Sequence, residues 1–170
     1  RTGDKGRSSL FSGERRRKDD ILFQLLGQGD QLNAFLGSCV VECVRIGDKK
    51  DLELSERIQY VQSRIMDVCS FVATPEKGED GRISSAERLN RVSLEEGMDK
   101  MLEKWIDEYE RDLPSLTNFV IPGGNELNAR LHVARGATRT WERLLVSWPV
   151  QEKSNTEIVK AQIMQFVNRL

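Results

Sequence analysis

Histidine and cysteine are scarce in this 170-residue sequence, which contains one histidine, His132, and three cysteines. Cys39 and Cys43 are four residues apart and could supply half of a metal site, but no second cysteine pair accompanies them. Cys69 makes the number odd, and all three cysteines lie among apolar residues. We therefore expect small buried thiols in a reducing compartment, no metal held by the protein, and no Ser–His–Asp or Cys–His catalytic machinery.

The sequence also lacks a dominant charge and a long apolar run. Its 26 Lys and Arg residues nearly balance its 27 Asp and Glu residues, which gives a net charge of −1. There is no general basic field for nucleic acid, no run of membrane-spanning length and no visible signal-peptide pattern. We therefore expect neither nucleic acid nor a membrane as partner. The length suits one domain with a substantial core.

The first twenty residues, RTGDKGRSSLFSGERRRKDD, are rich in glycine, hydroxyl side chains and cations. They hold seven Lys or Arg and four Asp or Glu residues, with little to bury besides Leu10 and Phe11. Such a segment cannot order itself by packing, but its backbone N–H groups can approach a ligand closely. This composition is typical of a loop that wraps a polyphosphate. The alternative is an ordinary solvated N-terminus, since the standard motif GxxxxGK(S/T) is absent.

From Asp19 onward the apolar residues recur with helical spacing, and strand alternation is absent. Ser93, three residues before Glu96, has the pattern of a capping box. Residues 76–91 are polar and contain glycine, which predicts a loop. We predict an all-α bundle of five helices: about 19–46, a second that ends before Pro75, a third from Ser93 through Tyr109, a fourth from Asn125 to near Pro149, and a fifth from about Asn155 to Leu170.

The fourth predicted helix carries a polar face. Spacings of three, four, three and one residues place together His132, Arg135, Arg139, Glu142 and Arg143. One interpretation is a solvated face with ion pairs along the helix. The other is an inner stripe whose three arginines need anionic partners, which a polyphosphate would satisfy bidentately. His132 itself is better explained as a hydrogen-bonded core histidine than as a base.

Asp30, in the segment GQGDQLN, interrupts the apolar stripe of the first predicted helix. We therefore expect an interior carboxylate that needs an arginine or several hydrogen-bond donors. A structural ion pair is favoured over a catalytic role on this pattern alone. The sequence contains no other distinctive pair of acid–base carboxylates.

Taken together, the motifs resemble one family. TGDKGRSS, GERRRKDD, GDQLN, FVIPGG, LHVARGATRTWER and VNRL occur in the order found in the ATP:cob(I)alamin adenosyltransferases of the propanediol-utilisation type, which have a human mitochondrial member. The resemblance spans nearly the whole chain. Each motif alone is weak, but the combination is specific.

The resemblance implies a fold, a reaction and partners. The family fold is a five-helix bundle that assembles as a homotrimer with active sites between subunits. The reaction transfers the 5′-deoxyadenosyl group of ATP to the cobalt of reduced cobalamin and releases triphosphate, with Mg2+ carried by the ATP phosphates. A cobalamin reductase and an adenosylcobalamin-dependent client enzyme are possible protein partners. The expected compartment is the mitochondrial matrix in a eukaryote and the cytoplasm in a bacterium.

The resemblance also implies which residues bind ATP. In the N-terminal segment, residues 1–18, these are Arg1, Thr2, Gly3, Asp4, Lys5, Gly6, Ser8, Ser9 and Lys18. In the bundle domain, residues 19–170, these are Arg139, Glu142, Arg143 and Asn168, the last near the nucleoside.

The implied catalytic group is Asp30, Arg135, Arg139 and Phe119. Asp30 and Arg135 match a pair that joins adjacent subunits beside the active site. Phe119 matches an aromatic residue that binds the corrinoid, crowds its lower face and keeps a cobalt ligand away. The nucleophile is the cobalt, so the absence of a side-chain nucleophile is expected.

The chain departs from the family pattern at a few positions. Thr140 stands where the family usually has a second arginine after the one matched by Arg139, Trp141 replaces a smaller residue, and Gln31 replaces an acidic residue. Relatives continue their last helix past the position of Leu170. The loss of one cation keeps open an alternative function, a non-catalytic ATP- or corrinoid-binding protein that delivers adenosylcobalamin to a client. A helical interaction module without nucleotide binding is less consistent with the retained cations.

Overall fold

The computed structural model describes residues 3–78, 81, 83–150, 152 and 154–170. These residues form two short strands and six helices, of which five are longer than ten residues. The predicted all-α bundle is therefore confirmed. The elements are β1 (Arg7–Ser9), β2 (Arg15–Arg17), α1 (Ile21–Ile46), α2 (Lys49–Val72), α3 (Ala86–Asn90), α4 (Met98–Glu110), α5 (Glu126–Ser147) and α6 (Asn155–Asn168).

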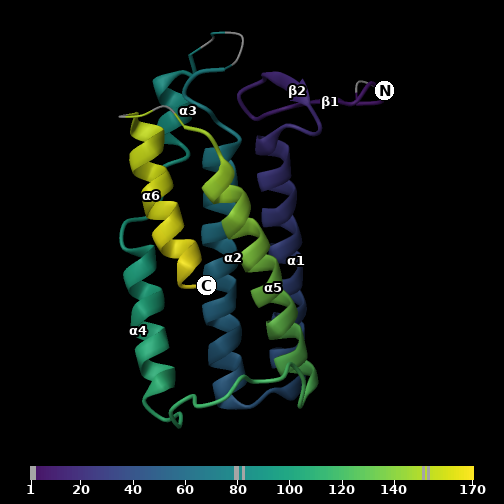
Figure 1. Ribbon diagram of the computed structural model, residues 1–170, viewed down its shortest axis with the longest axis vertical. Helices are drawn as coiled ribbons and strands as arrows, with labels where there is room; N and C mark the ends of the chain where they lie inside the picture. Colours follow the sequence, from purple (N-terminus) through teal and green to yellow (C-terminus); the bar gives the residue numbers. More distant parts are fainter. Residues whose placement is uncertain (1–2, 79–80, 82, 151, 153) are drawn as a thin grey trace.

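Three long helices make up the body of the bundle. α1 packs against both α2 and α5, and these three run side by side along the molecule (Figure 1). α6 packs on α5 and α4, with α6 beside the upper half of the bundle and α4 beside the lower half (Figure 1). The C-terminus therefore lies at mid-height of the bundle, at the lower end of α6 (Figure 1). None of the helices that the structure describes is both long and apolar enough to cross a bilayer.

Side-chain caps set the starts of the long helices. The carboxylate of Asp20 accepts from the N–H of Leu22 at α1, and the side chain of Asn125 accepts from the N–H of Asn128 at α5. Gly47, with a φ of 75°, ends α1 in the left-handed conformation that glycine adopts without strain. The predicted end of the first helix at about residue 46 and the predicted start of the fourth at Asn125 are both confirmed.

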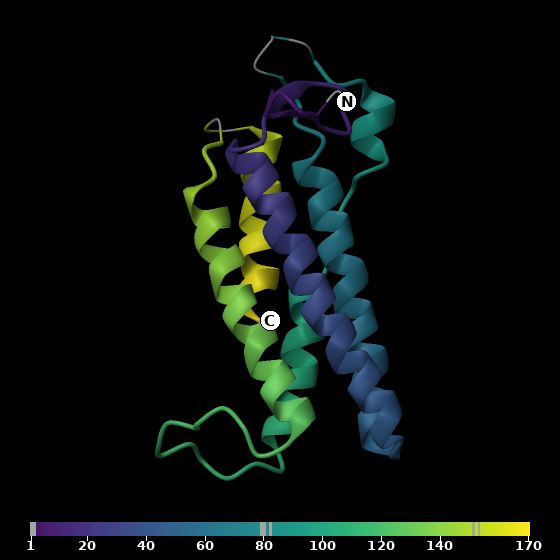
Figure 2. The ribbon, with the colours of Figure 1, turned by 90° about the vertical axis from the view of Figure 1, so that its right-hand side faces the viewer.

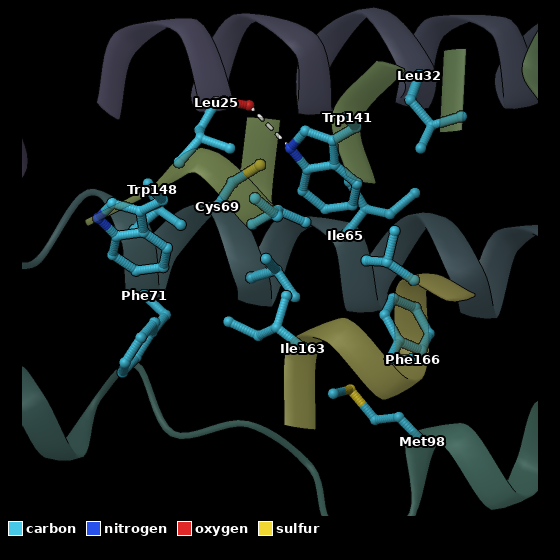
Figure 3. Close-up of a cluster of buried hydrophobic side chains, with 14 of the residues drawn as sticks. Leu25, Leu32, Ile65, Cys69, Phe71, Met98, Trp141, Trp148, Ile163 and Phe166 are labelled. Carbon is cyan, nitrogen blue, oxygen red and sulfur yellow. Dashed lines mark hydrogen bonds between the residues drawn. The ribbon is translucent and has the colours of Figure 1, made fainter. Parts of the chain in front are cut away.

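The core is continuous through the upper bundle. Its largest fully buried side chains include Trp141 of α5, Phe166 of α6 and Ile65 of α2 (Figure 3). Trp141 has a fractional exposure of 0% and its indole Nε1 donates to the carbonyl oxygen of Leu25 on α1 at 3.0 Å. A smaller cluster at the lower end of the bundle buries Cys39 and Cys43, as predicted for apolar cysteines.

The N-terminal segment is more ordered than its composition predicts. β1 and β2 form an antiparallel hairpin across the upper end of the bundle (Figure 2), where the sequence indicated no strand. Leu10 is 4% exposed and belongs to the main core, and the guanidinium of Arg88 donates to the carbonyl oxygen of Ser12 at 2.8 Å. The buried Leu10 and this hydrogen bond attach to the bundle a segment whose composition alone does not order it. The division of the chain at residue 18 stays a prediction.

Two predictions in the middle of the chain were wrong. Ser93 and Glu96 do not cap a helix, because α4 begins at Met98 after Gly97 in a left-handed conformation, with no side-chain cap bond. The predicted loop over 76–91 contains the one-turn helix α3, which starts after Ser85, whose side chain accepts from the N–H of Arg88. A five-residue helix is too short to show an apolar period, so composition alone indicated a loop.

Candidate active site

The candidate site is built on the polar face of α5. The buried stripe of this helix consists of Leu127, Ala134, Thr138, Trp141 and Leu145. The arginines lie on the other side: Arg135, Arg139 and Arg143 are all exposed. Of the two interpretations of this face, the isolated chain therefore shows the solvated one and not the inner arginine stripe. Within the described chain, Arg135 and Arg139 form no ion pair. Their charges are therefore available to a ligand or a partner subunit.

A close contact between helices fixes the position of this face. Gly29 of α1 passes so close to α2 that an added Cβ would lie 2.5 Å from the Sγ of Cys69, and 3.4 Å from the indole of Trp141. Only glycine fits here without displacing the neighbouring side chains. Near this position the indole N–H of Trp141 donates to the carbonyl oxygen of Leu25, which joins α5 to α1 (Figure 3). α5 is thus held in one register on α1.

Two of the predicted ATP-binding residues meet directly. The Nδ2 of Asn168, at the end of α6, donates to the Oε1 of Glu142 on α5 at 3.1 Å. The two residues are 26 positions apart in the sequence, and the contact brings the VNRL motif against the α5 motif. Asn168 is exposed and Glu142 half-buried, so both remain accessible from outside the bundle.

Arg143 lies over the junction between α5 and α1. An open hollow of about 650 Å³ is lined there by Phe23, Gln24, Gly27, Gln28, Thr140, Arg143 and Leu144. The Nη2 of Arg143 donates to the Oγ1 of Thr140 at 3.1 Å. Thr140, which stands where the family usually has a second arginine, thus contacts Arg143 through its hydroxyl. The i, i+3 spacing allows this contact, although no sequence motif indicates it.

His132 and Arg135 face a different space. They line an apolar cavity of about 370 Å³ between α2, α4 and α5, together with Arg57, Trp105 and Tyr109 among others. His132 is half-buried in this cavity wall rather than enclosed in the core. The five polar residues of the predicted face are therefore divided between two surfaces and do not line one pocket within a single chain.

The N-terminal candidates lie on the hairpin at the upper end. The N–H of Lys18 donates to the carbonyl oxygen of Gly6 at 2.9 Å, and the Lys18 ammonium lies beside Gly3. Ser8 belongs to β1 and is half-buried, whereas Asp4, Lys5 and Ser9 are exposed. Arg1 and Thr2 lie outside the described residues. The hairpin forms a polar, cation-bearing surface beyond the end of α1.

Asp30 is exposed, so the prediction of an interior aspartate was wrong. It follows the buried Gly29 by one residue, which turns it about 100° around the helix and away from the core. Asp30 forms no ion pair within the residues that the structure describes. Its charge still acts on Cys69, whose pKa burial raises to about 12, with Asp30 contributing in the same direction.

Phe119 lies at the opposite end from the hairpin. It is fully exposed, at 103%, in the segment 111–125 that projects from the lower end of the bundle (Figure 2). Leu116 and Ile121 in the same segment are 82% and 86% exposed. Because the ring is fully exposed, burial gives no support to a role of Phe119 as a packed anchor for the turn that follows it. Among the described residues, no cluster of three or more His, Cys, Asp and Glu side chains could hold a metal.

Comparison with known proteins finds relatives along the whole chain. The family model described as cobalamin adenosyltransferase matches residues 1–170. The whole chain is 37% identical to the corrinoid adenosyltransferase MMAB of Bos taurus, of which it covers 65%, and 36% identical to that of Homo sapiens, of which it covers 62%. It is also 32% identical to the corrinoid adenosyltransferase of Citrobacter freundii, of which it covers 86%.

The same similarity extends to three dimensions. A variant of the PduO-type ATP:corrinoid adenosyltransferase from Lactobacillus reuteri, complexed with cobalamin and ATP, has a TM-score of 0.74 and 27% identity. That comparison covers 98% of this chain and 83% of the Lactobacillus chain. The chain spans 62–66% of the length of its mammalian relatives. From its full-length match and its fold, this chain belongs to the cobalamin adenosyltransferase family.

Proposed function

We propose that this chain transfers the 5′-deoxyadenosyl group of ATP to the cobalt of cob(I)alamin and releases triphosphate. The observation that carries the proposal is the polar face of α5, where Arg135 and Arg139 have no carboxylate partner in the described chain and Glu142 contacts Asn168. The relatives named as corrinoid adenosyltransferases, and the Lactobacillus structure that holds cobalamin with ATP, support the same reaction.

The reaction assigns a limited role to the protein. The cobalt(I) electron pair attacks the ribose C5′, a Co–C bond forms, and the C5′–O bond breaks with its electrons leaving on the triphosphate. The chain must align C5′ with the cobalt and stabilise the charge on the leaving group. Arg139 and Arg143 would stabilise that charge from α5, and Lys5 and Lys18 from the N-terminal segment. The other ATP-binding residues expected in that segment are Arg1, Thr2, Gly3, Asp4, Gly6, Ser8 and Ser9.

Magnesium would reach the site with ATP. The described residues offer no three-ligand cluster for a metal, so the phosphate oxygens and water are the expected ligands of Mg2+. The arginines of α5 would supply positive charge to the triphosphate from the protein side, beside the charge that Mg2+ would supply when bound to the phosphates.

The complete site requires a second copy of the chain. Asp30 on α1 and Arg135 on α5 are exposed, oppositely charged and unpaired within the described residues, which suits an ion pair between neighbouring subunits. A homotrimer would bring the α1 surface of one subunit to the α5 surface of the next. Sedimentation experiments test this pair. The charge reversal Asp30→Arg should dissociate the trimer, and adding Arg135→Asp to the same chain should restore it. A wild type that is monomeric at micromolar concentration would refute the assembly.

The alternative is a non-catalytic protein that binds ATP or a corrinoid and delivers adenosylcobalamin to a client enzyme. Thr140, in place of a second arginine, is the feature that favours it. One assay separates the two functions: the chain is incubated with MgATP and cobalamin under strong reduction, and adenosylcobalamin absorbance and triphosphate release are followed. Turnover supports the transferase, and binding of both ligands without turnover supports the carrier. A cobalamin reductase and a client enzyme remain expected protein partners.

A further inference from the structure

A chain of hydrogen bonds joins α4 to the candidate nucleotide site. Glu103 on α4 accepts from the guanidinium of Arg169 through its Oε1, at 2.8 Å from Nε and 2.7 Å from Nη2. The Nη1 of the same guanidinium donates to the Oδ1 of Asn168 at 3.2 Å. The Nδ2 of Asn168 then donates to Glu142 at 3.1 Å. Four side chains from α4, the end of α6 and α5 thus form one connected path.

The path fixes the orientation of the Asn168 amide. A guanidinium can only donate hydrogen bonds, and an ionised carboxylate can only accept them. With Arg169 on one side and Glu142 on the other, only one amide orientation satisfies both neighbours. If the amide were rotated by 180°, its NH2 group would face the N–H donors of Arg169 and its oxygen would face the carboxylate of Glu142, so both hydrogen bonds would be lost.

Glu103 fixes the guanidinium in turn. Two of the three nitrogens of Arg169 bind the same carboxylate oxygen, which leaves Nη1 directed at Asn168. The side chains of Arg169 and Glu103 are 33% and 47% exposed, so their ion pair adds little to stability by itself. What the pair supplies is a fixed direction for the third nitrogen.

We propose that Glu103 and Arg169 are positioning residues of the nucleotide site, which act by holding Asn168 and, through it, Glu142. This inference rests on the proposed function, because it takes Asn168 and Glu142 as ATP ligands. Arg169 directly follows α6 in the VNRL motif, and Glu103 lies 66 positions away in the sequence, so no sequence pattern links them.

The sign of the effect at Glu103 distinguishes positioning from simple electrostatics. Removing a carboxylate near a polyanion should tighten ATP binding if only charge mattered. If Glu103 positions the path, Glu103→Ala should instead weaken ATP binding, by about three- to tenfold for the loss of one ordered hydrogen bond. Glu103→Gln keeps an acceptor oxygen and should recover most of the affinity.

The experiment measures the dissociation constant of MgATP by calorimetry and the steady-state kcat and KM in the adenosylation assay. Asp107→Ala is the matched control, because it removes a carboxylate one turn further along α4 whose side chain forms no hydrogen bond within the described residues. It should leave ATP binding unchanged. Arg169→Lys keeps the positive charge but cannot bind Glu103 and Asn168 at once with the fixed geometry of a guanidinium. It should therefore behave like Glu103→Ala rather than like wild type.

Coupling to Asn168 completes the test. In an Asn168→Ala chain the path is already broken, so adding Glu103→Ala should cause no further loss of ATP affinity. Additive losses, unchanged affinity in Glu103→Ala, or tighter binding would each overturn the inference. A wild type that binds ATP without turnover would refute the transferase and leave the inference to be judged on the dissociation constants. A wild type that does not bind ATP would refute both.

Discussion

Thr140 and Arg143, three residues apart on α5, are joined by a hydrogen bond of 3.1 Å from the Nη2 of Arg143 to the Oγ1 of Thr140. The same hydroxyl donates to the carbonyl oxygen of Gly136 at 3.2 Å. Because its proton is directed at the helix backbone, the oxygen presents a lone pair to the guanidinium. The threonine that stands in place of a family arginine therefore orients a neighbouring arginine.

Removing this hydroxyl should loosen Arg143. Thr140→Val keeps the shape of the side chain but cannot accept a hydrogen bond, and we expect the KM for ATP to rise about two- to fivefold. Thr140→Ser should match wild type. Ser147→Ala is the control, because Ser147 bonds the carbonyl of Leu144 on the same helix at 2.8 Å and contacts no arginine within the described residues. Equal KM values for Thr140→Val and wild type would contradict the orienting role.

Arg139 should contribute a full charge to phosphate binding. Arg139→Ala is expected to lower kcat/KM for ATP by about ten- to a hundredfold, since a charge-assisted hydrogen bond contributes roughly 1.5–3 kcal/mol. Arg130→Ala, at the other end of α5, is the matched control because Arg130 pairs with Glu126 at 3.0 Å. If Arg139→Ala remained folded with the kcat/KM of wild type, Arg139 would not be a phosphate ligand.

The helices were predictable because their signals are local, whereas the errors involve tertiary contacts. Asn125 caps α5 as its sequence indicates. The hairpin could not be predicted, because its order depends on the insertion of Leu10 into a core formed by distant helices. Asp30 was predicted to be interior because it interrupts the apolar stripe of the first helix, although the buried side of α1 passes through Gly29 and Leu32. The contact between Glu142 and Asn168 could not be predicted, because the spacing of residues within one helix does not indicate a partner on another helix.

The hairpin gives a prediction about proteolysis. Arg15 and Arg17 are exposed on β2, and Leu10 anchors the hairpin at 4% exposure. Leu10→Ala should lower the free energy of unfolding by about 2 kcal/mol or more, because it leaves a cavity where the leucine packs in the core. Tryptic cleavage in this segment should therefore become faster. Bound MgATP should slow cleavage if the segment wraps the phosphates. Phe11→Ala, at a residue 61% exposed, is the control and should cleave like wild type. Cleavage of Leu10→Ala at equal rates with and without MgATP would contradict wrapping.

Cys69 gives a prediction about alkaline stability. Burial, with a smaller contribution from Asp30, raises the pKa of Cys69 from 9.0 to about 12 in the folded chain. The unfolded thiol ionises from about pH 9 while the folded thiol stays neutral, so this contribution to stability is lost as the pH rises from 9 to 12. Urea unfolding at pH 8 and pH 10.5 should show a smaller decline for Cys69→Ala than for wild type. Parallel declines would exclude Cys69 as the source.

Phe119 combines full exposure with a proposed role against the corrinoid. A fully exposed ring stabilises the isolated chain little, so Phe119→Ala should change the free energy of unfolding by less than about 0.5 kcal/mol. If the ring crowds the lower face of the corrinoid, its loss should leave ATP binding nearly intact and slow adenosylation, most of all from cob(II)alamin. Loss of the lower ligand would ease reduction of the cobalt to its nucleophilic state, which is the effect expected if the ring keeps that ligand away.

The spectrum of cob(II)alamin with ATP bound measures this effect directly. Wild type should form a four-coordinate species, and Phe119→Ala should form much less of it. Ile121→Ala is the matched control, because Ile121 is 86% exposed in the same segment and has no assigned contact with cobalt. It should retain the four-coordinate signal and the rate. A folded Phe119→Ala chain that forms the species as fully as wild type would show that the ring does not shield the metal, and an unstable one would show that the ring anchors the segment.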